Sequence, residues 1–330
     1  MSRARGKYLI RSIPKLNEFF MGGVGEGTLT HIYGRYQSGK SLLALQILYE
    51  WVSSGVGNAL VIDSEHSFMD NFGYIWVDRF SRRFSSKVDL KTVVKARYSI
   101  KGGKRKYLTE VRTILLDVFE DLGIDVDPVY LKKVLDYLLP KIELKSEDRG
   151  GRSIYVYNCS GIEDFASLIG YEAALKAGSK LSVSASRISD PSTSPLSLFM
   201  SKYKVKFLFV DSLGGLLKNY VFSLQDYPAR AAILNIVLHT LATIADEYGL
   251  VVLVSNHESR SPANNFTSFY GGSPVGYGFK YSLYLRMKSP NIRELIGYRS
   301  PHLPEAGWRL SLHLSDEGFK EYDKSDKEDV

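Results

Sequence analysis

The chain has 330 residues, of which 44% are hydrophobic and 24% are charged. These values are close to the average of globular proteins, and they exclude a wholly disordered chain, a collagen-like repeat and a coiled coil. The formal net charge of +7 is local: residues 79–106 hold eleven basic residues and one acidic residue, a net +10, so the other residues sum to −3. Such a cluster is typical of a contact with an anionic partner.

Cysteine content and hydropathy indicate the compartment. Cys159 is the only cysteine, so no disulfide forms within the chain, and a reducing cytoplasmic setting is expected. The basic N-terminus lacks the apolar stretch of a signal peptide. No apolar run reaches the roughly 20 residues that cross a bilayer, so no membrane contact is expected.

Short apolar runs alternate with helical patterns along the chain. Near-continuous apolar runs, typical of strands that are covered on both faces, occur at 29–33, 59–62, 154–157, 207–210 and 250–254. Apolar residues at helical spacing predict helices over 41–51 and 229–248. Strands that alternate with helices predict an α/β fold with a mostly parallel central sheet.

The segment 76–152 has a different pattern. After the basic run, apolar residues at helical spacing predict helices over 108–122 and 128–142. We therefore expect a core formed by residues 1–75 and 153–330, and an inserted basic helical subdomain formed by residues 76–152. A Ser- and Pro-rich stretch over 179–197 predicts a loop.

Residues 34–41, GRYQSGKS, fit the phosphate-binding pattern G-x-x-x-x-G-K-[ST] between an expected strand and an expected helix. The glycines let backbone N–H groups face phosphate oxygens, Lys40 brings a positive charge to the β- and γ-phosphates, and the Ser41 hydroxyl binds Mg²⁺. An ordinary glycine-rich turn is the competing interpretation, and the flanking elements disfavour it. The predicted nucleotide-binding residues of this loop are Gly34, Arg35, Tyr36, Gln37, Ser38, Gly39, Lys40, Ser41 and Leu42.

Two carboxylates follow expected strands. Asp211 ends the run FLFVD, where an acid of P-loop proteins holds Mg²⁺ through water. Glu65 follows the strand at 59–62 and is placed to polarise an attacking water as general base. Each pattern is weak by itself, because many buried strands end in Asp and a Glu in such a turn is often a surface residue. Beside the phosphate loop, the two acids predict a site for ATP and Mg²⁺.

Taken together, these segments resemble the RecA/RadA family of recombinase ATPases, and archaeal-type RadA paralogues in particular. The similar stretches are GGVGEGTLTHIYGRYQSGKS, IDSEHSF, FLFVDS, TIADEYGLVVLVSNH, YGGSPVGYGFKYSLYLRMK and SPHLPEAGWRLSLHLSDEGF. They span residues 13–65 and 154–322, so the resemblance concerns the core domain only, with a basic insertion. It implies a RecA-like P-loop NTPase core in which Lys40 and Glu65 are catalytic and Ser41 and Asp211 lie at the metal.

The resemblance also implies an assembly. Residues 300–305, which include Pro301, match the family segment that caps ATP from a neighbouring subunit, so a homo- or hetero-oligomer with ATP at the subunit interface is expected. His257 stands where the family usually has Gln. An imidazole can still report a γ-phosphate by hydrogen bonding, with a different geometry and pH response, so His257 joins the catalytic set.

The family's two DNA-binding loops are depleted of charge here. Residues 219–226 contain no Arg or Lys, and residues 258–270 contain only Arg260. The basic run can replace those contacts, because it combines cations with Phe80, Phe84, Tyr98 and Tyr107, whose rings suit base stacking. A solvated helix face or a protein contact is the competing interpretation. The predicted DNA-binding residues are Arg79, Arg82, Arg83, Lys101, Lys104, Arg105, Lys106 and Arg260.

These observations predict a DNA-dependent or DNA-modulated ATPase that acts as an accessory factor in homologous recombination and DNA repair. We expect it in the cytoplasm at the nucleoid, bound to single-stranded rather than double-stranded DNA and paired with a RadA-type recombinase. One alternative is a strand-exchange recombinase that forms filaments. A second is an ATP-switched interaction or scaffold protein with little turnover. A RecA-type helicase or clock-type ATPase fits the phosphate loop but not the SPHLPE segment.

Overall fold

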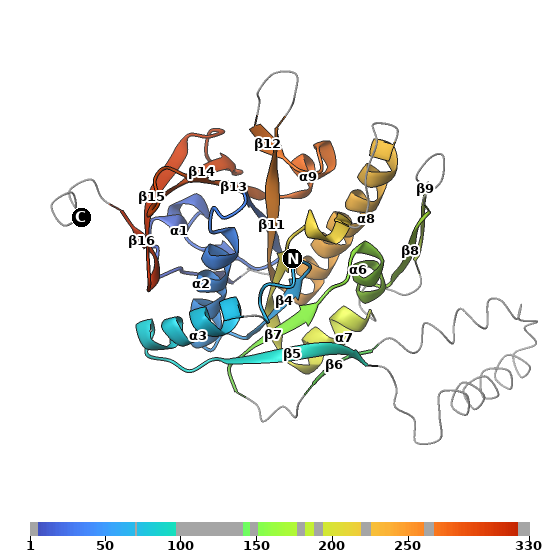
Figure 1. Cartoon of the computed structure of the whole chain (residues 1–330), viewed down its shortest axis with the longest axis horizontal. Helices are drawn as coiled ribbons and strands as arrows, with labels where there is room; N and C mark the ends of the chain where they lie inside the picture. Colours follow the sequence, from blue (N-terminus) through green and yellow to red (C-terminus); the bar gives the residue numbers. More distant parts are fainter. Residues whose placement is uncertain are drawn as a thin grey trace, which may run out of the picture.

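The computed structural model describes residues 6–69, 71–96, 141–145, 151–176, 182–187, 194–218, 226–260 and 267–322. One large sheet organises these residues (Figure 1). Its strands in chain order are β3 (Thr28–Gly34), β4 (Asn58–Asp63), β5 (Asp89–Ala96), β6 (Lys141–Leu144), β7 (Ser153–Asn158), β10 (Val205–Asp211), β11 (Val251–Arg260), β12 (Thr267–Phe269), β13 (Tyr281–Met287), β14 (Ile292–Arg299), β15 (Trp308–Ser315) and β16 (Gly318–Glu321).

The strands lie in the spatial order β16-β15-β14-β13-β3-β11-β10-β4-β7-β5-β6, with β12 paired to β11. From β13 to β5 each described strand is parallel to its neighbour, whereas β14, β15 and β16 extend one side antiparallel and β6 closes the other. The predicted α/β fold with a mostly parallel central sheet is therefore confirmed, and each predicted strand lies in it.

Two smaller ladders and the helices complete the described chain. The ladders pair β1 (Lys7–Tyr8) with β2 (Val24–Gly25) and β8 (Tyr171–Lys176) with β9 (Ser182–Arg187). The helices are α1 (Leu16–Phe19), α2 (Lys40–Ser53), α3 (Asn71–Arg83), α6 (Ile162–Leu168), α7 (Pro195–Lys202), the 3₁₀ turn η2 (Gly215–Leu217), α8 (Tyr227–Tyr248) and α9 (Ser273–Gly278).

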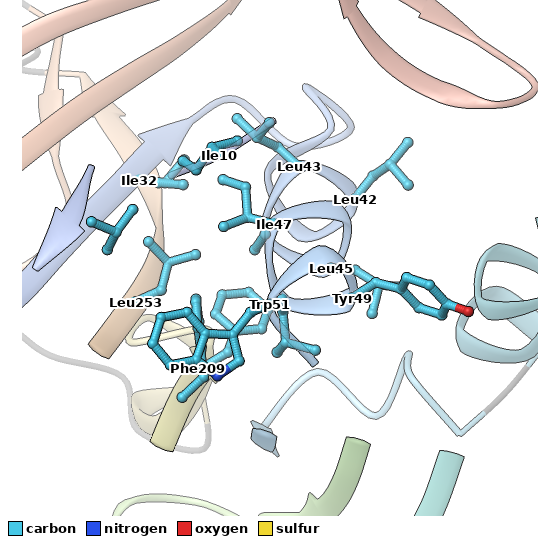
Figure 2. Packing of buried hydrophobic residues seen from close by; sticks show 14 of the residues in the cluster. Ile10, Ile32, Leu42, Leu43, Leu45, Ile47, Tyr49, Trp51, Phe209 and Leu253 are labelled. Carbon is cyan, nitrogen blue, oxygen red and sulfur yellow. The ribbon is translucent and has the colours of Figure 1, made fainter. Parts of the chain in front are cut away.

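Helices cover both faces of the sheet because its central strands alternate between two hydrophobic clusters. In β4, Val61 joins the cluster with α1, α2 and α3, and its neighbour Leu60 joins the cluster with α6, α7, α8 and α9. Figure 2 shows Ile47 and Trp51 of α2 pointing toward Leu253 of the sheet. By length and composition α8 could span a membrane, but it packs into the second cluster as a core helix does.

Both ends of the segment predicted as an insertion, 76–152, lie in this core. Helix α3 packs with α2, β5 pairs parallel to β7, and β6 pairs antiparallel to β5. The helix predicted over 108–122 and most of the one over 128–142 lie outside the described residues, and Lys141 and Ile142 belong to β6. The loop predicted over 179–197 contains β9 and the start of α7.

A buried histidine lies directly beside the phosphate loop, in β3. His31 is fully buried, and its ring stacks on those of Tyr33 and Phe279 at centroid distances of 5.1 and 4.6 Å. Neither ring nitrogen has a hydrogen-bond partner among the described residues. Burial therefore lowers the pKa of His31 to about 3, which keeps the imidazole neutral in the folded state.

His31 should make the protein sensitive to acid. The unfolded chain binds a proton at His31 below its ordinary pKa of 6.5, and the folded chain does so only near pH 3. The contribution of neutral His31 to the free energy of unfolding is thus fully present above pH 6.5. It falls by about 1.4 kcal/mol per pH unit between pH 6.5 and about pH 3. We expect His31→Phe to unfold less readily than wild type at pH 5 in urea, with a smaller gain at pH 7. An equal gain at both pH values would contradict this origin.

Candidate nucleotide site

The phosphate loop joins the end of β3 to the start of α2. Its two glycines, Gly34 and Gly39, are required for steric reasons. Gly39 has φ 99°, and a Cβ there would lie 2.8 Å from the Phe319 ring. A Cβ on Gly34 would lie 2.3 Å from the carbonyl oxygen of Leu285. Side chains are therefore excluded at both positions, and the backbone curls as phosphate binding requires.

A buried arginine supports the loop from behind. The Arg293 guanidinium, on β14, donates from Nε to the Ser38 carbonyl oxygen at 2.9 Å and from Nη1 to that of Ser289 at 2.9 Å. Its side chain is 4% exposed. Sequence reasoning missed this residue, because it becomes adjacent to the loop only through strand pairing at the antiparallel side of the sheet.

Lys40 points back into the loop. Its Nζ donates to the carbonyl oxygens of Gly34 at 3.1 Å and Arg35 at 2.8 Å, and the side chain is buried. Burial lowers the pKa of Lys40, and the negative charges of Asp211, Glu65 and Glu258 oppose that shift. The ammonium is thus held in place at the start of α2 and faced by carboxylates, where a polyphosphate would meet it.

Asp211, at the carboxyl end of β10, lies beside Ser41. Burial raises the pKa of Asp211 to about 6, and the hydroxyls of Ser255 and Ser41 oppose that rise. Ser255 donates to Oδ1, whereas Oδ2 is buried without a hydrogen-bond partner among the described residues. An unpartnered carboxylate oxygen next to a hydroxyl is the donor set that Mg²⁺ prefers, so these two residues fit the metal.

Glu65 is positioned by a turn after β4. Asp63 accepts the backbone N–H groups of Glu65 at 3.1 Å and Phe68 at 2.8 Å, which fixes the turn. The Glu65 carboxylate then accepts the Ser212 hydroxyl at 2.7 Å and lies 3.4 Å from His257 Nε2. The bond to His257 lowers the pKa of Glu65 to about 2, against the effect of burial. Glu65 is therefore ionised and restrained.

A single cavity of about 400 Å³ brings these groups together. It is lined by Tyr36, Gln37, Gly39, Lys40, Ser41, Leu42, Glu65, Ser67, Phe72, Asp211, Ser212 and His257. Four segments that are distant in the sequence therefore meet at one place, the carboxyl ends of β3, β4 and β10 and the adjoining part of β11, where parallel sheets bind ligands. Ser212 joins Glu65 to His257, a link that the sequence analysis missed.

Four predicted nucleotide contacts, Gly34, Arg35, Ser38 and Pro301, are not among the residues that line this cavity. The Arg35 side chain turns toward β11, where Nε lies 3.5 Å from the Glu258 carboxylate. Pro301 is exposed in the segment after β14. Its neighbours bind α1, with the Ser300 hydroxyl 3.5 Å from the Phe19 carbonyl oxygen and His302 Nε2 3.0 Å from that of Glu18. Within one chain, Pro301 thus lies apart from the phosphate loop.

Known proteins resemble this chain in sequence and fold. It is 31% identical over 131 residues to the DNA repair and recombination protein RadA of Cenarchaeum symbiosum, covering 37% of this chain and 33% of that protein. It is 23% identical over 317 residues to RadA of Haloquadratum walsbyi, covering 93% of this chain and 75% of that protein. The crystal structure of the RadB recombinase matches with a TM-score of 0.50 and 18% identity over 96% of this chain and 100% of that chain.

The chain is RecA/RadA-like. The sequence matches and the shared fold confirm the resemblance predicted from the motifs. No family model matches the chain. The match to the Cenarchaeum protein spans only about a third of that protein's length.

In this RecA/RadA-like chain the predicted DNA contacts are scattered. Lys101, Lys104, Arg105 and Lys106 lie outside the described residues, and Arg260 ends β11. On α3, the Arg79 guanidinium lies 4.8 Å from the centre of the Trp76 ring, and Arg82 forms an ion pair with Asp78 at 2.7 Å. Both are on the outer side of the helix.

Two aromatic or basic members of the run have roles inside the fold instead. Phe80 is fully buried in the first hydrophobic cluster, so the expectation that its ring stacks on bases is wrong. Arg83 donates from Nη1 to the carbonyl oxygens of Glu317 at 2.8 Å and Phe319 at 3.1 Å. It therefore ties α3 to the β15–β16 hairpin.

We expect the neighbouring arginines of α3 to differ in their effect on stability. Arg83→Gln removes two charge-assisted hydrogen bonds and should lower the free energy of unfolding by about 1–2 kcal/mol. Arg82→Gln removes only an exposed i,i+4 ion pair and should change it by less than about 0.5 kcal/mol. Urea unfolding of both variants measures the difference. Equal losses of unfolding free energy in the two variants would show that the hydrogen bonds of Arg83 to the hairpin do not stabilise the fold.

Proposed function

We propose that this chain is a RadA-like recombinase paralogue that binds and hydrolyses ATP with Mg²⁺, as an accessory factor in homologous recombination and DNA repair. Its relatedness to RadA and RadB supports a role in recombination and repair. The observation that carries the proposal is the single cavity in which Lys40, Asp211 and Glu65 meet. A triphosphate with its metal needs a cation, a metal-holding acid and a water-activating carboxylate in this arrangement.

Each residue has a distinct part in that reaction. Lys40 and the N-terminus of α2 neutralise phosphate charge, and Ser41 and Asp211 hold Mg²⁺. When bound, Mg²⁺ stabilises the negative charge that develops on the phosphate oxygens. Glu65, ionised by its contacts, accepts a hydrogen bond from a water and orients it toward the terminal phosphorus. Preorganised positions of this kind provide most of the rate gain in phosphoryl transfer.

His257 is the sensor in this proposal. Its backbone N–H donates to the Asn256 side-chain oxygen at 2.9 Å, and the Asn256 amide donates to the Tyr270 carbonyl oxygen at 2.7 Å. Tyr270 follows β12, in the second of the family's loops. A movement of His257 when a nucleotide fills the cavity can thus be transmitted to that loop through two hydrogen bonds.

DNA, and single-stranded DNA in particular, is the proposed macromolecular partner, together with a RadA-type recombinase. We further propose an oligomer in which Pro301 of one subunit caps the ATP of its neighbour, in the cytoplasm at the nucleoid. The exposure of Pro301, away from its own chain's cavity, is compatible with that geometry. The low charge of the second loop disfavours a filament-forming strand-exchange enzyme.

An ATP-switched interaction protein with little turnover is the second candidate. The observation that favours it is that Ser212 and His257 both contact Oε1 of Glu65, so one of the two carboxylate oxygens is already engaged within the protein.

Phosphate release from Mg–ATP, measured with and without a single-stranded oligonucleotide, tests the proposal. We expect continuous release that the oligonucleotide stimulates. Tight ATP binding without release under either condition would favour the switch, and absence of ATP binding would overturn both candidates.

A further inference from the structure

A basic groove lies at the end of the sheet opposite to the nucleotide cavity. We call it the edge groove; it has a volume of about 610 Å³, and its lining includes Gly55, Asn58, Arg152, Lys204, Lys206 and Tyr248. These residues come from the starts of β4 and β10, the residues before β7, and the end of α8. No acidic side chain is among its lining residues in the described chain.

Two of its cations have no partner among the residues that the structure describes. Lys206 is occupied, because its Nζ donates to the Tyr248 carbonyl oxygen at 2.6 Å at the end of α8. Arg152 and Lys204 are exposed, and their side chains have no hydrogen-bond or ion-pair partner within the part of the chain that the structure describes. Like charges without acidic partners repel one another, and an anion in the groove would relieve that cost.

The basic surface continues beyond the groove in two directions. Strand β5 begins beside it, where the Asp89 N–H donates to the Arg152 carbonyl oxygen at 2.9 Å, and Lys91 follows on this strand. At the end of α7, the Lys202 ammonium lies 5.1 Å from the centre of the Tyr203 ring. Cations on a surface that also carries aromatic rings suit the backbone and bases of a nucleic acid.

We propose that the edge groove, through Arg152 and Lys204, binds the phosphate backbone of single-stranded DNA. This inference rests on the proposed function and adds the place where DNA lies. Strand β4 runs from Asn58 at the groove to Asp63, whose turn holds Glu65. Five residue steps of strand, about 16 Å, separate the two ends. DNA in the groove therefore lies apart from the ATP.

The test compares two variants with matched changes in net charge. Arg152→Gln combined with Lys204→Gln removes these two cations of the groove. Arg11→Gln combined with Lys15→Gln removes one Arg and one Lys from an exposed segment near α1 and serves as the control. Binding of labelled oligo-dT is followed by anisotropy over a range of salt concentrations, and Mg–ATP affinity is measured alongside.

We expect the slope of log K against log salt to be less steep by about 1.4 in the groove variant than in the wild type. Near 0.1 M salt the DNA affinity of this variant should be about 25-fold lower, with ATP affinity unchanged. The control variant should keep the wild-type slope. A wild-type slope in the groove variant, or equal losses in both, would overturn the groove and leave the proposed function standing. No DNA binding by the wild type would overturn the DNA part of the proposed function itself. Polyglutamate, as a model of an acidic protein, is tested in the same assay. If the groove variant loses polyglutamate binding and keeps DNA binding, the groove is a site for an acidic protein and this inference is overturned.

Discussion

Lys40→Ala should abolish Mg–ATP binding at physiological nucleotide concentrations. The ammonium is buried and held by the carbonyl oxygens of Gly34 and Arg35, so Lys40→Ala removes a positive charge that is fixed at the phosphate loop. Loss of one partner of a buried charge pair costs about 2–5 kcal/mol, which raises Kd about 30- to 4000-fold.

Thermal unfolding measures this effect without depending on turnover. A ligand at 100 times its Kd stabilises the wild type by about 2.7 kcal/mol, and at the same concentration this gain should fall below about 1 kcal/mol in Lys40→Ala. Lys320→Ala is the control, since the Lys320 side chain is exposed, pairs with Glu317 and does not line the cavity. A Lys40→Ala variant with wild-type ATP affinity would remove the phosphate-loop assignment.

Glu65→Gln should retain ATP affinity and lose turnover. Gln has nearly the same shape and can still bind Ser212, but it cannot accept a proton from water. A general base contributes about 10²- to 10⁴-fold to a rate, so kcat should fall by that factor while KM changes little.

The matched control for this variant is Glu317→Gln, which removes an exposed carboxylate on the β15–β16 hairpin. Its kcat should equal that of the wild type. Equal, near-zero rates of wild type and Glu65→Gln would instead identify an ATP-switched protein. A substantial rate that Glu65→Gln does not change would assign the general base to another residue.

Features with a local physical cause could be predicted from the sequence. The strands β3, β4, β7, β10 and β11 are covered on both faces, so each contains a near-continuous apolar run that stands out in the sequence. The phosphate loop has a fixed spacing because its backbone must curl around phosphate, and its glycines are the ones that tolerate no Cβ. The placement of Glu65 and Asp211 beside this loop could also be predicted, because the carboxyl ends of parallel strands lie at the same edge of a sheet.

Contacts set by strand order and by the edges of the sheet could not be predicted. Arg293 reaches the phosphate loop from a strand that follows it by more than 250 positions, and no local pattern marks that distance. Ser212 links Glu65 to His257 only because β4, β10 and β11 are neighbours.

The expectation that Phe80 stacks on bases was wrong for a physical reason. Helix α3 is amphipathic, with Val77 and Phe80 buried and Arg79 and Arg82 on its outer side, and a charge count averages over both sides. The apolar spacing at 77 and 80 was the available signal that this helix packs on the core. With β5, it places the start of the segment 76–152 in the main sheet.

The central claim is that Lys40, Asp211 and Glu65 surround one triphosphate. A crystal structure of the protein with Mg²⁺, ADP and aluminium fluoride tests it most directly, because this complex resembles the γ-phosphoryl group during transfer. We predict Lys40 Nζ and the 34–41 backbone on the phosphates, the metal at Ser41 and Asp211, and a water between Glu65 and the fluoride. Nucleotide bound outside the cavity, or with Glu65 turned away from the terminal group, would contradict the account.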